Sequence, residues 1–246
     1  KDQKLTEVEI IIKLYKALGT ASFKLLEGMF AFTLYDPYQK ALHIARDFFG
    51  KKPIFYYLDN NYFYAASLTS TLFSLNIPKI IKDNVLQDIV VSRHIFDGIY
   101  KDIFELQPGS FGTFLLENKS FKVNYFLKKS DLISKKDYEI RSKSSSEDIQ
   151  DEFTELINNA IKKRKCHEVK SGIILSGGID SSILSYYGLK NGFNSFFHLE
   201  SLDNSELQDA KNISEELSIN LIHDFIDKNR FINYLKETIK SWEYPL

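Results

Sequence analysis

The apolar residues in the first half of the chain change from a helical period to a strand period. Over residues 8–18 they follow the spacing of an amphipathic helix, and Gly19 comes next as a residue that favours a helix end. Beyond that glycine, short apolar runs alternate with turn residues. The strands predicted by this alternation cover residues 28–35, 41–45, 54–58, 62–66, 111–116 and 121–126. Hairpins in series with one or two helices indicate an α+β layered structure.

In the second half, helical periods stand on either side of short apolar runs. A helix capped by Ser146 is predicted to extend to the basic run 162–165, whose positive charges suit the carboxyl end of a helix. It is followed by a strand over 172–175, a helix over 180–190, a strand over 193–199 and a helix over 206–217. This alternation predicts a parallel sheet and therefore an α/β unit.

A polar stretch separates the two halves. Residues 131–146 are rich in serine and in charged side chains, a composition typical of a linker. We therefore predict one domain over residues 1–130 and a second over residues 147–246. An excursion of the chain inside a single domain is the alternative.

Composition and charge narrow the class of protein. Hydrophobic residues make up 43% of the 246 residues and charged residues 26%, the balance of an ordinary folded protein. The 32 lysine and arginine residues against 33 aspartate and glutamate residues give a net charge of -1, so neither nucleic acid nor an anionic membrane is expected as a partner. No apolar run is long enough to span a membrane. A single cysteine and the lack of a leader pattern favour a cytoplasmic location.

The most informative segment for chemistry is residues 173–182, where an apolar run meets Ser176-Gly177-Gly178 and then a predicted helix. Adjacent glycines let the backbone turn tightly and bring N–H groups close to an anion, and the start of a helix adds unpaired donors. Asp180 would repel a bare anion, but it fits a Mg²⁺ ion held between a carboxylate and a phosphate. The segment therefore predicts a site for a metal-bound polyphosphate. The alternative is a structural glycine turn with Asp180 as a helix cap.

Other polar patterns are interpreted as structural. Arg46 and Asp47 are predicted to form an ion pair that braces the hairpins. Cys166, the single cysteine, is interpreted as a helix-end or core thiol rather than a nucleophile. The lysine-bearing phosphate loop, the Gly-x-Gly-x-x-Gly pattern and the ligand spacings of zinc sites do not occur in the sequence.

Two sets of motifs resemble a known family. Residues 176–182 resemble the pyrophosphate-binding loop of the ATP pyrophosphatases, and residues 172–175 before them are most similar to the asparagine synthetase branch. Residues 26–32 and 45–57 resemble the later part of a class II glutamine amidotransferase domain, and residues 104–109 resemble its closing hairpin. Both sets stand in family order over nearly the whole chain. The sequence is thus similar to the glutamine-hydrolysing asparagine synthetase family, as an internal fragment.

The resemblance implies a fold for each half and a set of site residues. The folds would be an incomplete N-terminal-nucleophile hydrolase-like layered sandwich, then an incomplete parallel-sheet domain of the adenine nucleotide hydrolase type. Glu7 would replace a family aspartate that binds the α-ammonium group of glutamine, with one methylene more, and Asp180 would bind Mg²⁺. The residues implied to bind ATP and pyrophosphate are Leu175, Ser176, Gly177, Gly178, Asp180, Ser181, Ser182 and His198.

The family's glutaminase nucleophile is an N-terminal cysteine, and no residue of this sequence matches it. The catalytic residue is therefore left unassigned. We interpret this as the mark of a fragment, and we expect the 246-residue chain alone not to hydrolyse glutamine.

The function implied by the resemblance is ATP-dependent amidation. A carboxylate, aspartate in the named family, would be adenylated by Mg-ATP with release of pyrophosphate and then amidated with ammonia from glutamine. A homodimer is also compatible with the family. The alternatives are a related amidotransferase or cyclase acting on a sugar, β-lactam or peptide precursor, a non-catalytic ATP-binding chain, and a transfer-RNA-modifying enzyme with the same loop.

Overall fold

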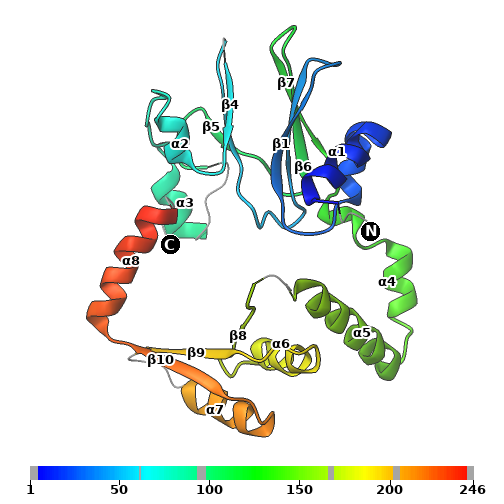
Figure 1. Cartoon of the computed structure of the whole chain (residues 1–246), viewed down its shortest axis with the longest axis vertical. Helices are drawn as coiled ribbons and strands as arrows, with labels where there is room; N and C mark the ends of the chain where they lie inside the picture. The colour runs from blue at the N-terminus through cyan, green and yellow to red at the C-terminus, as the bar shows by residue number, and fades with distance from the viewer. Residues whose placement is uncertain (1–4, 61, 93–97, 166–168, 202–205, 243–246) are drawn as a thin grey trace. The chain divides into compact units, whose positions relative to one another are not determined.

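The computed structural model describes residues 5–60, 62–92, 98–165, 169–201 and 206–242. The chain divides into two compact units, one formed mainly by Lys1–Ser134 and the other by Lys135–Lys240. Figure 1 labels most of the helices and strands of both units. Each unit is described by itself.

Helix α1 (Glu7–Leu18) is fixed at its start by a capping box. The hydroxyl of Thr6 accepts a hydrogen bond from the backbone N–H of Glu9 at 3.3 Å, and the carboxylate of Glu9 accepts one from the backbone N–H of Thr6 at 2.8 Å. The bonds from the Thr6 backbone and side chain lower the pKa of Glu9. Gly19, with a φ of 59°, ends the helix. The predicted helix and its stop are confirmed.

The strands of the first unit form two antiparallel sheets. The 4-stranded sheet has the order β1 (Ala31–Asp36), β2 (Ala41–Arg46), β6 (Ser110–Leu115) and β7 (Ser120–Tyr125). The 3-stranded sheet has the order β4 (Phe63–Ala66), β3 (Phe55–Leu58) and β5 (Ile103–Glu105). The predicted hairpins are confirmed, whereas the sequence pattern did not predict β5. Four short helical elements were also not predicted: η1 (Gly19–Leu25), α2 (Thr69–Phe73), α3 (Val85–Ser92) and η2 (Lys129–Asp131).

An aromatic core lies between the two sheets. The ring of Phe63 on β4 lies 5.0 Å from that of Phe121 on β7, and the ring of Tyr56 on β3 lies 4.8 Å from Phe121, measured between centroids. Ile44 of β2 is fully buried in the same cluster. The two sheets therefore pack face to face.

Helical elements cover the outer faces of both sheets. Phe23 of η1 packs with Ala45 of β2 on the 4-stranded sheet, together with Tyr15 of α1. Leu72 of α2 and Val85 of α3 belong to the cluster on the 3-stranded sheet. The order of layers in the first unit is therefore helix, sheet, sheet, helix.

A chain of buried polar side chains joins α1 to the 4-stranded sheet. The hydroxyl of Tyr15 donates to the carboxylate of Asp36 at 2.9 Å and lies 2.8 Å from Nε2 of His43, whose Nδ1 lies 2.9 Å from the hydroxyl of Thr113. Because the Tyr15 proton goes to Asp36, we assign the His43 proton to Nε2, which leaves Nδ1 to accept from Thr113. Burial lowers the pKa of His43 and raises that of Tyr15, and backbone N–H donors lower that of Asp36. These groups fix α1 on the sheet with every member of the chain hydrogen-bonded.

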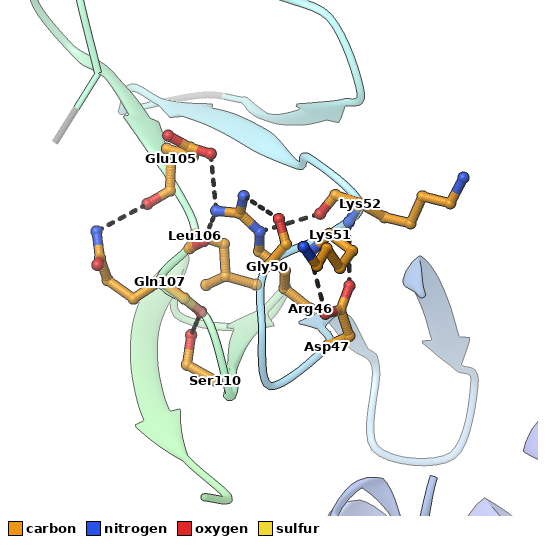
Figure 2. Close-up of polar contacts among 9 residues, drawn as sticks. All are labelled: Arg46, Asp47, Gly50, Lys51, Lys52, Glu105, Leu106, Gln107 and Ser110. Atoms are coloured by element: carbon orange, nitrogen blue, oxygen red, sulfur yellow. Dashed lines mark hydrogen bonds and ion pairs between the residues drawn. The ribbon is translucent and has the colours of Figure 1, made fainter. Parts of the chain in front are cut away.

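Arg46, at the end of β2, fastens the two sheets to each other (Figure 2). Its guanidinium forms an ion pair with Glu105 on β5 at 2.7 Å and donates to the backbone carbonyl of Leu106 at 2.7 Å. It also donates to the carbonyls of Gly50 at 2.9 Å and Lys52 at 3.0 Å. The predicted ion pair between Arg46 and Asp47 is therefore wrong, because the guanidinium reaches across to Glu105.

Asp47 has a different task, which is to fold the turn after β2. Its carboxylate accepts hydrogen bonds from the backbone N–H groups of Phe49 at 3.1 Å, Lys51 at 3.0 Å and Lys52 at 3.0 Å, and from Phe30 at 3.3 Å. Figure 2 shows Lys51 and Lys52 bound in this way. A single carboxylate thus satisfies the N–H groups of a turn that has no strand to pair with.

The second unit contains a parallel sheet, as predicted. The 3-stranded sheet has the order β10 (Leu221–Ile226), β9 (Phe196–Ser201) and β8 (Ile173–Ile174), and both pairs are parallel. The helices are α4 (Lys135–Arg141), α5 (Ser146–Arg164), α6 (Ile179–Lys190), α7 (Glu206–Glu216) and α8 (Lys228–Trp242). Ile161 of α5 and Phe196 of β9 are buried in the core of this unit. None of the helices in the described ranges is long and apolar enough to cross a membrane.

Three features of the second unit differ from the sequence pattern. Helix α5 is capped by Ser145 rather than Ser146, because the Ser145 hydroxyl accepts from the backbone N–H of Asp148 at 3.1 Å. The stretch predicted as a linker, residues 131–146, contains α4. Strand β10 and helix α8 were not predicted.

The buried chain at His43 predicts how stability depends on pH. Because the pKa of His43 is lower in the folded chain than its ordinary value of 6.5, the unfolded chain binds more protons near that pH. The stabilisation from a neutral His43 is present above pH 6.5 and is lost as the pH falls below it. In urea unfolding between pH 7 and pH 5, we expect the free energy of unfolding to fall less steeply for His43→Gln than for the wild type. Equal slopes would contradict a pKa of His43 that is lower in the folded chain than in the unfolded chain.

The link between the sheets predicts a cost for Arg46→Lys. A lysine keeps one charge beside Glu105 but cannot serve the carbonyls of Gly50 and Lys52 as well, so we expect a loss of about 2 kcal/mol in the free energy of unfolding. Arg141→Lys is the matched control, since the pair of Arg141 with Glu152 is exposed and should be worth about 0.5 kcal/mol or less. Similar losses in the two variants would show that Arg46 is not a structural link.

Candidate functional site

The candidate site is the turn that joins β8 to α6. Leu175 follows β8 and is fully buried, and its N–H donates to the carbonyl of Phe197 on β9 at 2.8 Å. The chain then turns over residues 176–178 and enters α6 at Ile179. The predicted sequence of strand, glycine turn and helix is confirmed.

Gly177 allows the turn to pack closely against α7. Its φ is +92°, a conformation that side chains rarely adopt, and a Cβ there would lie 2.6 Å from Cβ of Asp209 and 2.8 Å from the backbone N of Ala210. Ala210 is fully buried on α7. The turn therefore rests directly on the backbone of α7, and only glycine allows so close an approach.

Gly178, unlike Gly177, has free space around the position that a Cβ would occupy. Its backbone is extended, with φ -71° and ψ 160°, and a Cβ on it would meet only the hydroxyl of Ser176, at 3.5 Å. It is the N-cap of α6 and provides no side-chain hydrogen bond to the helix. The first N–H groups of a helix have no partner inside the helix, so this end of α6 presents donors to an incoming anion.

The serine hydroxyls of the turn bind one another and the backbone. The hydroxyl of Ser181 donates to the carbonyl of Gly178 at 3.0 Å and accepts from the N–H of Ser176 at 3.1 Å. The hydroxyl of Ser182 also donates to Gly178, at 2.9 Å. The hydroxyls predicted to reach phosphate are thus used to hold the turn, which leaves the backbone as the main source of donors.

Asp180 lies in the first turn of α6 and is exposed. Among the described residues, no cluster of three or more histidine, cysteine, aspartate or glutamate side chains could hold a metal ion. Mg²⁺ in nucleotide sites commonly uses one or two carboxylates together with phosphate oxygens and water. An exposed Asp180 beside open backbone donors fits that coordination.

His198 on β9 contacts Leu175, the residue that leads into the same turn. Its Nδ1 lies 2.8 Å from the carbonyl oxygen of Leu175, and the residue is 4% exposed. Nε2 is buried and has no hydrogen-bond partner among the described residues. The structure thus brings the predicted residues 175–182 and His198 together.

Glu7 belongs to the first unit, where it is the first residue of α1 and is exposed. Of the two acidic residues in the first turn of α1, Glu9 is used in the capping box and Glu7 is not. The sequence analysis did not predict that Asp209 and Ala210 support the turn. Cys166 lies outside the described residues.

Comparisons with known proteins assign both halves of the chain. Residues 3–126 match the family model of the glutamine amidotransferase domain, and residues 152–246 match that of asparagine synthase. The two matches cover the first unit and the part of the second unit that carries the turn.

Individual relatives agree with the family models. Putative asparagine synthetase [glutamine-hydrolyzing] 2 of Methanocaldococcus jannaschii is 31% identical over 184 residues, 72% of this chain and 34% of the relative. Putative asparagine synthetase [glutamine-hydrolyzing] 1 of the same organism is 27% identical over 233 residues, which cover 95% of this chain and 40% of the relative. Amidase chry2 of Gibberella zeae is 29% identical over 181 residues, which cover 72% of this chain and 26% of the relative. The chain thus spans well under half the length of these relatives.

The two glycines of the turn predict opposite responses to one methyl group. Gly177→Ala must move the turn away from α7, so we expect a loss of about 2 kcal/mol or more in the free energy of unfolding. Gly178→Ala has both space and an ordinary backbone conformation, so its unfolding should differ from the wild type by about 0.5 kcal/mol or less. Urea unfolding followed by circular dichroism measures both. A Gly177→Ala variant as stable as Gly178→Ala would refute the close packing on α7.

Proposed function

Because the chain belongs to the family of glutamine-hydrolysing asparagine synthetases, we propose that it carries parts of two sites of an ATP-dependent amidotransferase. In the proposed reaction, a carboxylate oxygen attacks the α-phosphorus of Mg-ATP, and pyrophosphate leaves. Ammonia released from glutamine then attacks the acyl carbon, and AMP leaves as the amide forms. Aspartate is the acceptor that we propose first.

The observation that carries the proposal is the open helix start at the turn of residues 176–178. We propose that the backbone N–H groups in the first turn of α6, which have no partner inside the helix, bind the β- and γ-phosphates. Charge builds up on the pyrophosphate as the bond to the α-phosphorus breaks, and donors fixed in advance stabilise that charge. The serine hydroxyls contribute by holding the turn in this shape.

Asp180 is the residue proposed to bind Mg²⁺, since its carboxylate is exposed beside those donors. When bound, Mg²⁺ would neutralise charge on the pyrophosphate leaving group. Leu175, the first residue after β8, is proposed to lie at the adenosine end of the same site, and His198 on β9 is proposed to belong to the site through the contact of its Nδ1 with the Leu175 carbonyl.

For the first unit we propose the glutamine site. Its layers follow the order helix, sheet, sheet, helix, which supports an N-terminal-nucleophile hydrolase-like fold. Glu7 is exposed at the start of α1, and we propose that its carboxylate binds the α-ammonium group of glutamine. The catalytic nucleophile is not assigned to any residue of this chain.

A second acceptor class is favoured by one finding. The chain is 29% identical to amidase chry2, whose name is not that of an asparagine synthetase. We therefore keep a carboxylate other than aspartate, such as a sugar, β-lactam or peptide precursor, as the second candidate. The exchange of pyrophosphate into ATP in the presence of each carboxylate separates the two.

Asp180→Asn in the full-length protein tests the proposal. We expect acceptor-dependent exchange between pyrophosphate and ATP to fall by on the order of 10²-fold, because a group that stabilises the leaving pyrophosphate is lost. Glutamine hydrolysis without ATP should stay near its wild-type rate.

Asp148→Asn is the control for Asp180→Asn, since Asp148 also lies in the first turn of a helix but has no glycine turn before it. It should leave the exchange unchanged. Exchange that survives in Asp180→Asn, or that is lost equally in both variants, would argue against the role of Asp180.

A further inference from the structure

The peptide group between Leu175 and Ser176 is held at both ends by side chains. Its carbonyl oxygen, on Leu175, lies 2.8 Å from Nδ1 of His198 on β9. Its N–H, on Ser176, donates to the hydroxyl of Ser181 on α6 at 3.1 Å. This peptide is the entrance to the turn, so its orientation sets the direction in which the next N–H groups point.

The ladder between β8 and β9 ends at this point. β8 itself contains only Ile173–Ile174, and the N–H of Leu175 donates to Phe197 at 2.8 Å. Beyond that bond, no backbone N–H of the described residues donates to the Leu175 carbonyl, and the imidazole of His198 takes that place. The side chain thus extends the sheet by one hydrogen bond into the turn.

The geometry also fixes which nitrogen of His198 carries a proton. A carbonyl oxygen can only accept, so Nδ1 must be the donor in this contact. In the neutral ring Nε2 is then a bare acceptor, and it is buried without a partner among the described residues. An unpartnered buried acceptor has a cost in stability. An apolar side chain would avoid that cost but would lose the bond to Leu175.

We propose that His198 is a positioning residue for the nucleotide site: through Nδ1 it orients the Leu175–Ser176 peptide, and it supports nucleotide binding without contacting the nucleotide through Nε2. This inference rests on the proposed function of the turn. It differs from direct contact with adenosine, because a contact through the ring would need Nε2 or a ring edge to be exposed, and His198 is 4% exposed.

Two amide variants separate the nitrogens. The amide N–H₂ of asparagine reaches about as far as Nδ1 of histidine, whereas that of glutamine reaches about as far as Nε2. For the full-length protein titrated with Mg-ATP, we expect His198→Asn to bind within about threefold of the wild type. We expect His198→Gln to bind roughly tenfold more weakly, because the hydrogen bond to the Leu175 carbonyl is lost and a factor of ten corresponds to about 1.4 kcal/mol.

Each outcome of the titration decides between the claims. If both variants bind like the wild type, or both are weakened equally, the positioning role is wrong while the nucleotide site stands. If the full-length wild-type protein itself does not bind Mg-ATP, the proposed function fails, and the inference with it.

A measurement on the wild type covers the case in which a variant does not fold. The ¹⁵N spectrum of the His198 ring should show a protonated Nδ1 and an unprotonated Nε2 in the chain without nucleotide, and addition of Mg-ATP should leave this tautomer unchanged. A ring protonated at Nε2 alone, or a switch of tautomer on addition of Mg-ATP, would overturn the inference.

Discussion

The close approach of Gly177 to α7 is the constraint on which the candidate site depends. At Gly177 the turn lies so close to the backbone N of Ala210 that a side chain would not fit. The φ of +92° at this residue also favours glycine. While α7 supports the turn at Gly177, the hydroxyls of Ser181 and Ser182 bind the carbonyl of Gly178 and so join the turn to the start of α6. The result is a rigid bend whose donors are set before any ligand arrives. Such preorganisation is what makes backbone N–H groups effective against a charge that develops during a reaction.

The first unit solves a different problem, which is to hold two sheets in register without a continuous strand between them. Arg46 does this by binding Glu105 and the carbonyl of Leu106 from the other sheet, while Asp47 folds the turn that follows β2. The buried chain from Tyr15 to Thr113 then fixes α1, and with it Glu7, on the outer face. The exposed carboxylate proposed for glutamine is thus supported by groups that lie inside the layers.

The sequence pattern predicted several of the parts of this fold that repeat over several residues, but it missed β10 and α8. Helix α1, the hairpins and the strand–turn–helix at residues 173–190 follow from periodicity and from their stop signals. It did not predict β5 or α2, which contain three and five residues and are too short to show a period. The partner of Arg46 could not be found either, since Glu105 becomes its neighbour only when the sheets pack. For His198 the sequence indicated the site, but only the structure showed that the ring is bound to Leu175.

The central claim is that the backbone N–H groups in the first turn of α6 bind a metal-bound pyrophosphate group. The most direct measurement is a titration of the ¹⁵N-labelled chain with magnesium pyrophosphate, followed through its backbone amide signals. The account predicts saturable changes that are largest at residues 176–182 and that require Mg²⁺. Signals at these residues that do not move up to millimolar pyrophosphate, while the chain remains folded, would contradict it.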